Sequence, residues 1–289
     1  MTVKDTVFEN KKNINCRGKL LDLSTPVVMG ILNVTPDSFY DGGINKSEKE
    51  ILLHVEKMLS EGAAIIDIGG VSTRPGARIP DIKEELGRLT PMLKIIRKKF
   101  PDTIISVDTF RSEVAKISVN DLGADIINDI SAGSMDEKMF ETIAAIQVPY
   151  IIMHMQGTPE NMQKNPVYNN VVQEVVKYLA EKVNHLRTLG VHDIIIDPGF
   201  GFGKTVKHNY ELMTKLDHFK VFGLPVLAGV SRKSMINKVL GCKPEGALNG
   251  TTVLNTIAIM KGASILRVHD VKEAVEVVGI LVRVGCSSE

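Results

Sequence analysis

The chain has 289 residues, of which 44% are hydrophobic, so it is long enough to bury a large core. Its 35 basic and 34 acidic residues give a formal net charge of +1, which provides no electrostatic reason to expect nucleic acid or an anionic membrane as a partner. Three widely spaced cysteines suit a reducing cytoplasm, and neither a secretory signal nor a membrane-spanning run is present. We expect one cytoplasmic domain over residues 1–289.

Eight short apolar runs, each bounded by turn residues, recur along the chain. They are continuous rather than alternating, which is typical of parallel strands covered on both faces. The runs span residues 26–33, 63–70, 103–110, 124–130, 148–155, 193–199, 225–233 and 264–270. Before the first run, residues 14–24 predict a short hairpin that closes the bottom of the sheet.

Helical patterns separate these runs. The first helix is predicted to begin with a capping box from Ser47 to Glu50, and a longer one over 169–190 ends at Gly190. Residues 271–284 predict the last helix. Strand followed by helix, eight times, predicts a (β/α)8 TIM barrel with its active site at the C-terminal ends of the strands. A doubly wound open sheet has the same alternation, and the count of eight favours the barrel.

Nearly every predicted strand ends in a polar residue that the apolar pattern does not explain. One such residue is more often a satisfied core group, but a ring of them at one barrel face indicates a ligand site, because clustered buried charges are costly without a partner. The ring comprises Asn33, Asp67, Asp108, Asn128, His154, Asp197, Lys233, Arg267 and His269.

The ring divides by chemistry. Asp108, Asn128 and Asp197 suit a flat heterocycle with an amidine-like donor edge, since a carboxylate accepts two N–H bonds at once. The donor-rich remainder, which includes Arg267 and the loop residue Arg74, suits a phosphate or diphosphate.

Two other motifs were weighed. The stretch "GFGFGKT" at 199–205 fails as a phosphate-binding loop, because Pro198 stands where the first glycine is needed. It reads better as a glycine-rich loop that offers Phe200 or Phe202 for stacking. The seven histidines show no HExxH pattern, so their spacing does not favour a zinc site.

The motifs together resemble those of dihydropteroate synthases over essentially the whole chain. "MGILNVTPDSFYDGG" (29–43) and "IIDIGGVSTRPGA" (65–77) resemble the family's first two signatures. "SVDTF", "INDISAG", "MHMQGTP", "DPGFGFGKT", "SRKS" and "RVHDV" follow in the family's order. Val71 departs from the pattern, because many relatives carry Glu there.

The resemblance implies condensation of a dihydropterin hydroxymethyl diphosphate with 4-aminobenzoate, giving dihydropteroate and diphosphate in folate synthesis. It implies catalysis by Asp108, Lys233, Arg267 and His269, and pterin binding by Asp108, Asn128, Met153, Asp197, Phe202 and Lys233. It implies diphosphate binding by Asn33, Thr73, Arg74, Arg267 and His269, with Mg²⁺ on Asn33. For 4-aminobenzoate it implies Phe39, Thr73, Arg74, Pro75, Lys233 and Ser234.

Two rival functions remain to be weighed. A methyltetrahydrofolate-type methyltransferase shares a pterin site but needs no diphosphate site, and should lack "NVTPDSF" and "RVHD" together. A pterin-binding module without activity should have lost Lys233 or Arg267, and both are present. Relatives are commonly homodimers, for which residues 250–262 and 271–284 could supply a surface.

Overall fold

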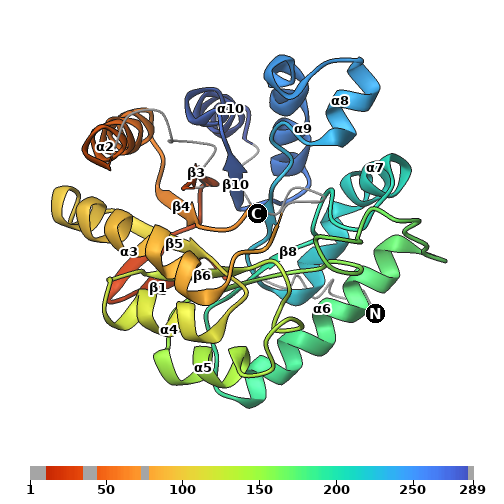
Figure 1. Ribbon diagram of the computed structural model, residues 1–289. Helices are drawn as coiled ribbons and strands as arrows, with labels where there is room; N and C mark the ends of the chain where they lie inside the picture. The colour runs from red at the N-terminus through yellow and green to blue at the C-terminus, as the bar shows by residue number, and fades with distance from the viewer. Residues whose placement is uncertain (1–10, 35–43, 73–77, 286–289) are drawn as a thin grey trace, which may run out of the picture.

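Eight parallel strands form the centre of the molecule, with helices around them (Figure 1). The computed structural model describes residues 11–34, 44–72 and 78–285. The strands are β3 (Val27–Asn33), β4 (Ile65–Gly69), β5 (Ile104–Asp108), β6 (Ile126–Asp129), β7 (Tyr150–Met153), β8 (Ile194–Asp197), β9 (Leu227–Ala228) and β10 (Ile265–Val268).

The sheet closes on itself. The strand order is β8-β7-β6-β5-β4-β3-β10-β9, and a parallel bridge between Ile196 and Val226 joins the two ends. The Ile196 amide donates to the Pro225 carbonyl at 3.0 Å across this seam. The prediction of a TIM barrel is therefore confirmed, and the open sheet is excluded.

Helices cover the outside of the barrel. They are α2 (Ile44–Ser60), α3 (Ile82–Lys99), α4 (Ser112–Asn120), α5 (Met139–Ile146), α6 (Val171–Thr188), α7 (Val206–Thr214), α8 (Ser234–Leu240), α9 (Leu248–Met260) and α10 (Val271–Arg283), with 3-10 turns η1 (Leu216–Phe222) and η2 (Pro244–Gly246). Their apolar faces pack on the outward side chains of the strands in one continuous core that includes Val55, Leu93 and Leu179. No helix among the described residues is long and apolar enough to cross a membrane.

Two local predictions were wrong. The helix α2 begins at Ile44, three residues before the proposed capping box, so Ser47 lies inside the helix rather than at its start. The strand predicted over 225–233 is reduced to Leu227–Ala228, and the residues after it form a loop that ends with Lys233 at the N-cap of α8. By contrast, Gly190 follows α6 with φ +79°, as its predicted role at the helix end requires.

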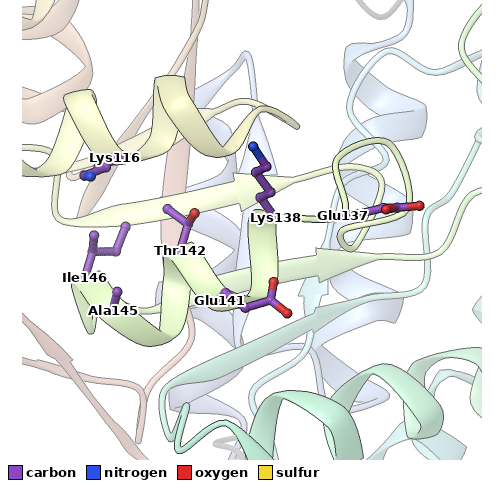
Figure 2. Close-up of a pocket in the computed structure, with 7 residues that line it drawn as sticks. All are labelled: Lys116, Glu137, Lys138, Glu141, Thr142, Ala145 and Ile146. Carbon is purple, nitrogen blue, oxygen red and sulfur yellow. The ribbon is translucent and has the colours of Figure 1, made fainter.

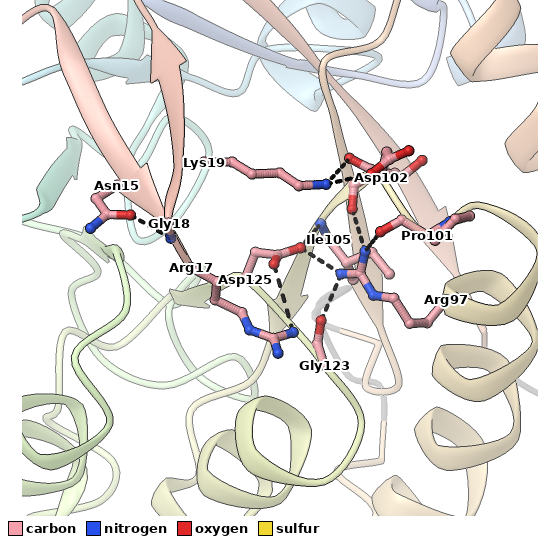
Figure 3. Close-up of polar contacts among 11 residues, drawn as sticks. Asn15, Arg17, Gly18, Lys19, Arg97, Pro101, Asp102, Ile105, Gly123 and Asp125 are labelled. Carbon is pink, nitrogen blue, oxygen red and sulfur yellow. Dashed lines mark hydrogen bonds and ion pairs between the residues drawn. The ribbon is translucent and has the colours of Figure 1, made fainter.

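The hairpin of β1 (Asn13–Cys16) and β2 (Lys19–Asp22) closes the bottom of the barrel, as predicted. Its inward side chains pack against the first inward residues of the strands, and this cluster includes Ile14, Cys16, Leu21, Leu23, Met29, Ile65, Ile126, Ile151, Ile195, Leu227 and Ile265. Polar contacts fasten its turn. Lys19 bonds Asp102 at 2.8 Å, and Arg17 faces Asp125, which is also paired with Arg97 at 2.5 Å (Figure 3).

The alternation of side chains along each strand determines what faces the barrel mouth. The first inward residue of each strand is apolar and belongs to the bottom cluster. The second inward residue lies two positions further on, because successive side chains point to opposite faces. These second positions hold Ile31, Asp67, Ser106, Asn128, Met153, Asp197, Gly229 and Arg267. The side chains that face the barrel interior therefore change from apolar to mostly polar over two residues along each strand.

Candidate active site

Arg267 lies at the centre of the polar group inside the barrel. Its Nε donates to Asp67 Oδ2 at 2.6 Å, and its Nη2 donates to Asp108 Oδ2 at 2.9 Å. Asn128 Nδ2 donates to the same Asp67 oxygen at 3.2 Å. Four strands, β4, β5, β6 and β10, thus contribute to one hydrogen-bonded group although their residues are up to 200 positions apart in the chain.

Two glycines keep the space beside this group open. A Cβ built on Gly229 would lie 3.7 Å from Lys233 Nζ, 3.9 Å from Asp197 Oδ2 and 3.9 Å from Arg267 Cβ. A Cβ on Gly69 would lie 3.7 Å from Asn33 Oδ1 and 3.8 Å from Asp108 Oδ2. The two glycines are therefore surrounded by the predicted site residues, and their missing side chains leave room at the mouth.

Lys233 is held over the mouth by its loop. Its Nζ donates to the Phe200 carbonyl and lies 4.7 Å from the ring centroid of Phe202. The preceding residue, Arg232, makes two hydrogen bonds to the Asp270 carboxylate, at 3.0 and 2.5 Å, which attach this loop to the end of β10. The lysine therefore reaches the site from a helix N-cap rather than from a strand end.

Burial governs the electrostatics of the site. It raises the pKa of Asp108 and of Asp197 above the ordinary carboxyl value, although Arg267 opposes the first shift and Lys233 the second. Burial also lowers the pKa of Lys233 to about 8, against the attraction of Asp197. The protonation states of these groups therefore depend on one another, and a bound charged or polar ligand would change them.

An apolar wall lies beside the polar group. Its buried members are Val71, Phe110, Ile130 and Met153, with the half-buried Ile79, Met135, Met155 and Phe202 packed against them. Val71, which stands where many relatives have Glu, is 8% exposed and belongs to this wall. The valine therefore has a packing role here, and the site is built without a carboxylate at that position.

The glycine-rich loop after β8 is organised by a buried lysine. Lys204 Nζ donates to the carbonyls of His154, Gly199 and Phe202 at 3.1, 2.8 and 3.0 Å, and lies 3.0 Å from His154 Nδ1. Gly199 has φ +74°, and a Cβ there would come within 2.0 Å of the His154 carbonyl oxygen. The loop therefore requires glycine where it crosses the end of β7.

His154 does not join the ring, contrary to the prediction. Its imidazole contacts Lys204 and lies against the rings of Tyr168 and Tyr178, with centroid distances of 6.0 and 4.9 Å. Burial and the Lys204 cation lower its pKa to about 3, so it is neutral at pH 7. It is a satisfied core residue.

The remaining predicted residues divide into three groups. Asn33, Asp108, Asn128, Met153, Asp197, Phe202, Lys233 and Arg267 meet at the mouth. His269 and Ser234 are exposed: His269 Nδ1 lies 3.0 Å from Ser231 Oγ, and Ser234 begins α8 directly after Lys233. Phe39, Thr73, Arg74 and Pro75 lie outside the described residues.

Several residues that the structure connects to the site have no role in the sequence prediction. Asp67 belonged to the ring but was not assigned, although the strand alternation alone places it in line with Ile65 and Gly69. Lys204 lay inside a motif that was read for its glycines. Glu85 is fully buried and contacts Arg111 and, at 2.7 Å, Thr109 Oγ1, the residue after Asp108. No local sequence pattern predicted this contact between α3 and the segment that follows β5.

A cavity lies away from the mouth. It has a volume of about 440 Å³ and opens between α4 and α5 (Figure 2). It is lined by Lys116, Glu137, Lys138, Glu141, Thr142, Ala145 and Ile146. Its charged side chains are exposed to solvent and gather no buried polar atom, so the mouth is the better site.

Among the described residues, no group of three or more His, Cys, Asp or Glu side chains could hold a metal ion.

The fold and the mouth together define a TIM-barrel enzyme whose interior offers carboxylates, an amide and cations to a polar ligand. Comparison with known proteins specifies the class. The family described as "Pterin binding enzyme" matches residues 29–269. The dihydropteroate synthase of Haemophilus influenzae is 49% identical over 255 residues, covering 88% of this chain and 92% of the relative. That of Escherichia coli K12 is 46% identical over 267 residues, covering 92% and 94%.

A solved structure agrees in fold. Xanthomonas albilineans dihydropteroate synthase with 4-aminobenzoic acid has a TM-score of 0.88 and 38% sequence identity, covering 96% of this chain and 99% of that one. The chain belongs to the dihydropteroate synthase family. It is a transferase that joins a dihydropterin hydroxymethyl diphosphate to 4-aminobenzoate, with release of diphosphate, in folate synthesis.

Proposed function

We propose that the barrel mouth binds the pterin ring between Asp108, Asn128, Asp197 and Lys233, with Met153 and Phe202 along its faces. The observation that carries this proposal is the pair of buried carboxylates. Asp197 is 6% exposed, and its Oδ1 accepts the Gly199 amide at 2.7 Å. Its Oδ2 borders the space beside Gly229. A ring that brings two N–H donors supplies the charge-assisted bonds that a buried carboxylate needs.

Arg267, His269 and Asn33 would hold the diphosphate, together with Thr73 and Arg74. Arg267 lies in the interior with two carboxylate contacts, while the exposed His269 and Asn33 lie at the ends of β10 and β3. In this proposal their donors would lie above the pterin ring, where the leaving group of the substrate would emerge. Lys233 and Ser234, with Phe39 and Pro75, would contact the 4-aminobenzoate.

The Asn33 side chain fits the expected Mg²⁺. Its amide oxygen is a hard ligand that lies beside Asp108 near Gly69, and Mg²⁺ commonly takes one or two protein oxygens and completes its shell with water and substrate phosphates. When bound, the ion would neutralise charge on the diphosphate oxygens. The protein's own part is to orient that group: Arg267 and His269 donate hydrogen bonds to it.

We favour departure of diphosphate before attack by the amine. The Arg267 guanidinium would stabilise negative charge on the departing oxygens, and the Asp108 carboxylate would favour positive charge on the ring-bound carbon. Both groups are already positioned 2.9 Å apart in the protein. An aryl amine is neutral and nucleophilic at pH 7, so the reaction requires no general base to activate it.

We also propose that the protein is a cytoplasmic homodimer. Cys16 and Cys242 are free thiols, which suits a reducing compartment. The helices α8 to α10 carry exposed apolar side chains, among them Val253 at 50%, Met260 at 60% and Ile280 at 63%. A second copy of the chain would remove such a surface from water.

The assignment of roles is tested by diphosphate release on mixing the pterin diphosphate with 4-aminobenzoate, with and without Mg²⁺. Native protein should release diphosphate only with both substrates. Asn33→Ala should raise the Mg²⁺ concentration needed for half-maximal rate, whereas the exposed Asn161→Ala should not. Equal Mg²⁺ dependence of the two variants would remove Asn33 from the metal site.

A further inference from the structure

Asp67 connects three strands inside the barrel. It lies in the middle of β4 and is fully buried. Its Oδ2 accepts two hydrogen bonds, from Arg267 Nε of β10 at 2.6 Å and from Asn128 Nδ2 of β6 at 3.2 Å. Both donors belong to residues that we place around the substrate, while Asp67 itself lies behind them.

The two carboxylates that hold Arg267 differ in position. The Asp108 side chain is 13% exposed and that of Asp67 is not exposed at all. A pterin bound to Asp108 would compete for the oxygen that accepts Arg267 Nη2. The Nε contact to Asp67 is out of reach of such a ligand. Because a guanidinium is a rigid plane, fixing Nε also fixes the direction in which the terminal nitrogens point.

Stability alone does not account for this arrangement. Both hydrogen bonds go to Oδ2, while Oδ1 is buried with no hydrogen-bond partner among the residues that the structure describes. A buried ion pair with an unsatisfied oxygen is a poor stabiliser compared with well-packed apolar side chains. The geometry instead favours a role in orienting Arg267, because the single oxygen that makes hydrogen bonds holds the Arg267 Nε at 2.6 Å.

We propose that Asp67 is a positioning residue for departure of the diphosphate. It holds Arg267 through Nε while the terminal nitrogens exchange the Asp108 carboxylate for diphosphate oxygens. Arg267 is therefore in place before the substrate arrives, and its donors are realigned without loss of its anchor. This inference rests on the proposed role of Arg267 at the diphosphate.

The test is a double-mutant cycle on turnover with Asp67→Asn and Arg267→Lys. Asp67→Asn keeps the size of the side chain but weakens the hold on Nε, so kcat should fall, by up to about a hundredfold if the guanidinium moves by about 1 Å. Affinity for a pterin that lacks the diphosphate should not change. Arg267→Lys should cost much less in the Asp67→Asn background than in the native one, because the two residues act together.

Ser106→Ala is the matched control. Ser106 is the register partner of Asp67 on β5 and is equally buried, and its hydroxyl has no hydrogen-bond partner within the described part of the chain. Its loss should leave both kcat and pterin affinity unchanged. Equal losses of kcat and of pterin affinity in Asp67→Asn would overturn the inference, as would an Arg267→Lys effect of the same size in both backgrounds. If Arg267→Lys alone leaves turnover intact, the proposed diphosphate role itself fails, and the inference fails with it.

A measurement on the native protein covers the case in which Asp67→Asn does not fold. The Nε–H resonance of Arg267 can be identified by its absence in Arg267→Lys. It should keep its chemical shift and its protection from hydrogen exchange when inorganic diphosphate and a pterin are added together. A large shift or loss of protection would show that the Nε contact is not retained, and would overturn the inference.

Discussion

The single residue that tests the pterin site most directly is Asp197. Asp197→Asn keeps the shape of the side chain but removes the charge that accepts two ring N–H groups. We expect a loss of about 1.5–3 kcal/mol in affinity for a pterin without diphosphate, as for a hydrogen bond to a charged group. Titration calorimetry measures it. Asp193→Asn, directly before the same strand, weakens the ion pair with Lys11 and should bind normally. Unchanged binding by Asp197→Asn would exclude the residue from the site.

Lys233 should give the enzyme an alkaline limit. Burial lowers its pKa to about 8, so the side chain is a cation below that pH and loses its proton above it. If the cation contacts the substrates, kcat/KM should fall as the pH rises past 8, since this ratio reports groups of the free enzyme. In Lys233→Arg the group stays charged, so this fall should disappear even if the rate is lower. A fall at the same pH in that variant would assign the limit to another group.

At the scale of elements, the hairpin β1–β2 offers a comparison between adjacent residues. Leu21 is 7% exposed and packs into the bottom cluster, whereas Leu20 is 73% exposed. Leu21→Ala should lower the free energy of unfolding by about 2–5 kcal/mol, because it removes buried methyl groups and leaves a cavity. Leu20→Ala should change it by less than about 0.5 kcal/mol. Urea unfolding measures both. Similar values for the two variants would mean that the hairpin does not form part of the folded core.

The helix α3 is attached to the segment between β5 and α4. Arg111, at the N-cap of α4, pairs with the buried Glu85 of α3 and donates to the Pro80 carbonyl at 2.5 Å. Arg111→Met should cost about 3–5 kcal/mol in unfolding free energy, because it leaves a buried carboxylate unpaired. Adding Glu85→Gln should recover part of the loss. Arg78→Met, which removes an exposed ion pair with Glu84, is the control and should cost almost nothing. Equal effects of Arg111→Met and Arg78→Met in urea unfolding would contradict this account.

Features of the fold that depend on local sequence were predictable, whereas contacts between distant parts of the chain were not. The strands, the hairpin and the polar strand ends were predictable because alternation and turn residues are local signals. The start of α2 was mispredicted, since the Ser47–Glu50 pattern also fits inside a helix. The partners of Arg267 were not predictable. They depend on which strands are neighbours and on their register, and Asp67 lies 200 residues away in the chain. His154 was misplaced because a polar residue after a strand can turn outward.

Over the whole molecule, exposed apolar side chains are unevenly distributed. Of the twelve large ones on the described residues, eight lie between Val239 and Val284, on or beside α8, α9 and α10. The helices α9 and α10 lie side by side on the barrel (Figure 1). Lys233 and Ser234 place the start of α8 at the mouth, whereas the exposed Val239 and Leu240 lie at the opposite end of this helix. We expect the dimer to form through α9, α10 and this end of α8, which leaves the mouth open to solvent.

This arrangement gives the last prediction, which concerns assembly. A stable interface buries about 800 Å² on each partner, and a charge placed in its centre without a counterion is strongly unfavourable. Val253, 50% exposed on α9, should lie near that centre, so Val253→Glu should convert the protein from a dimer to a monomer in sedimentation velocity. Val167→Glu introduces the same change at a residue that is 71% exposed between β7 and α6, and should leave the dimer intact. Because the proposed site residues come from one chain, the Val253→Glu monomer should retain pterin affinity. A native protein that sediments as a monomer, or a Val253→Glu variant that remains a dimer, would exclude this surface as the interface.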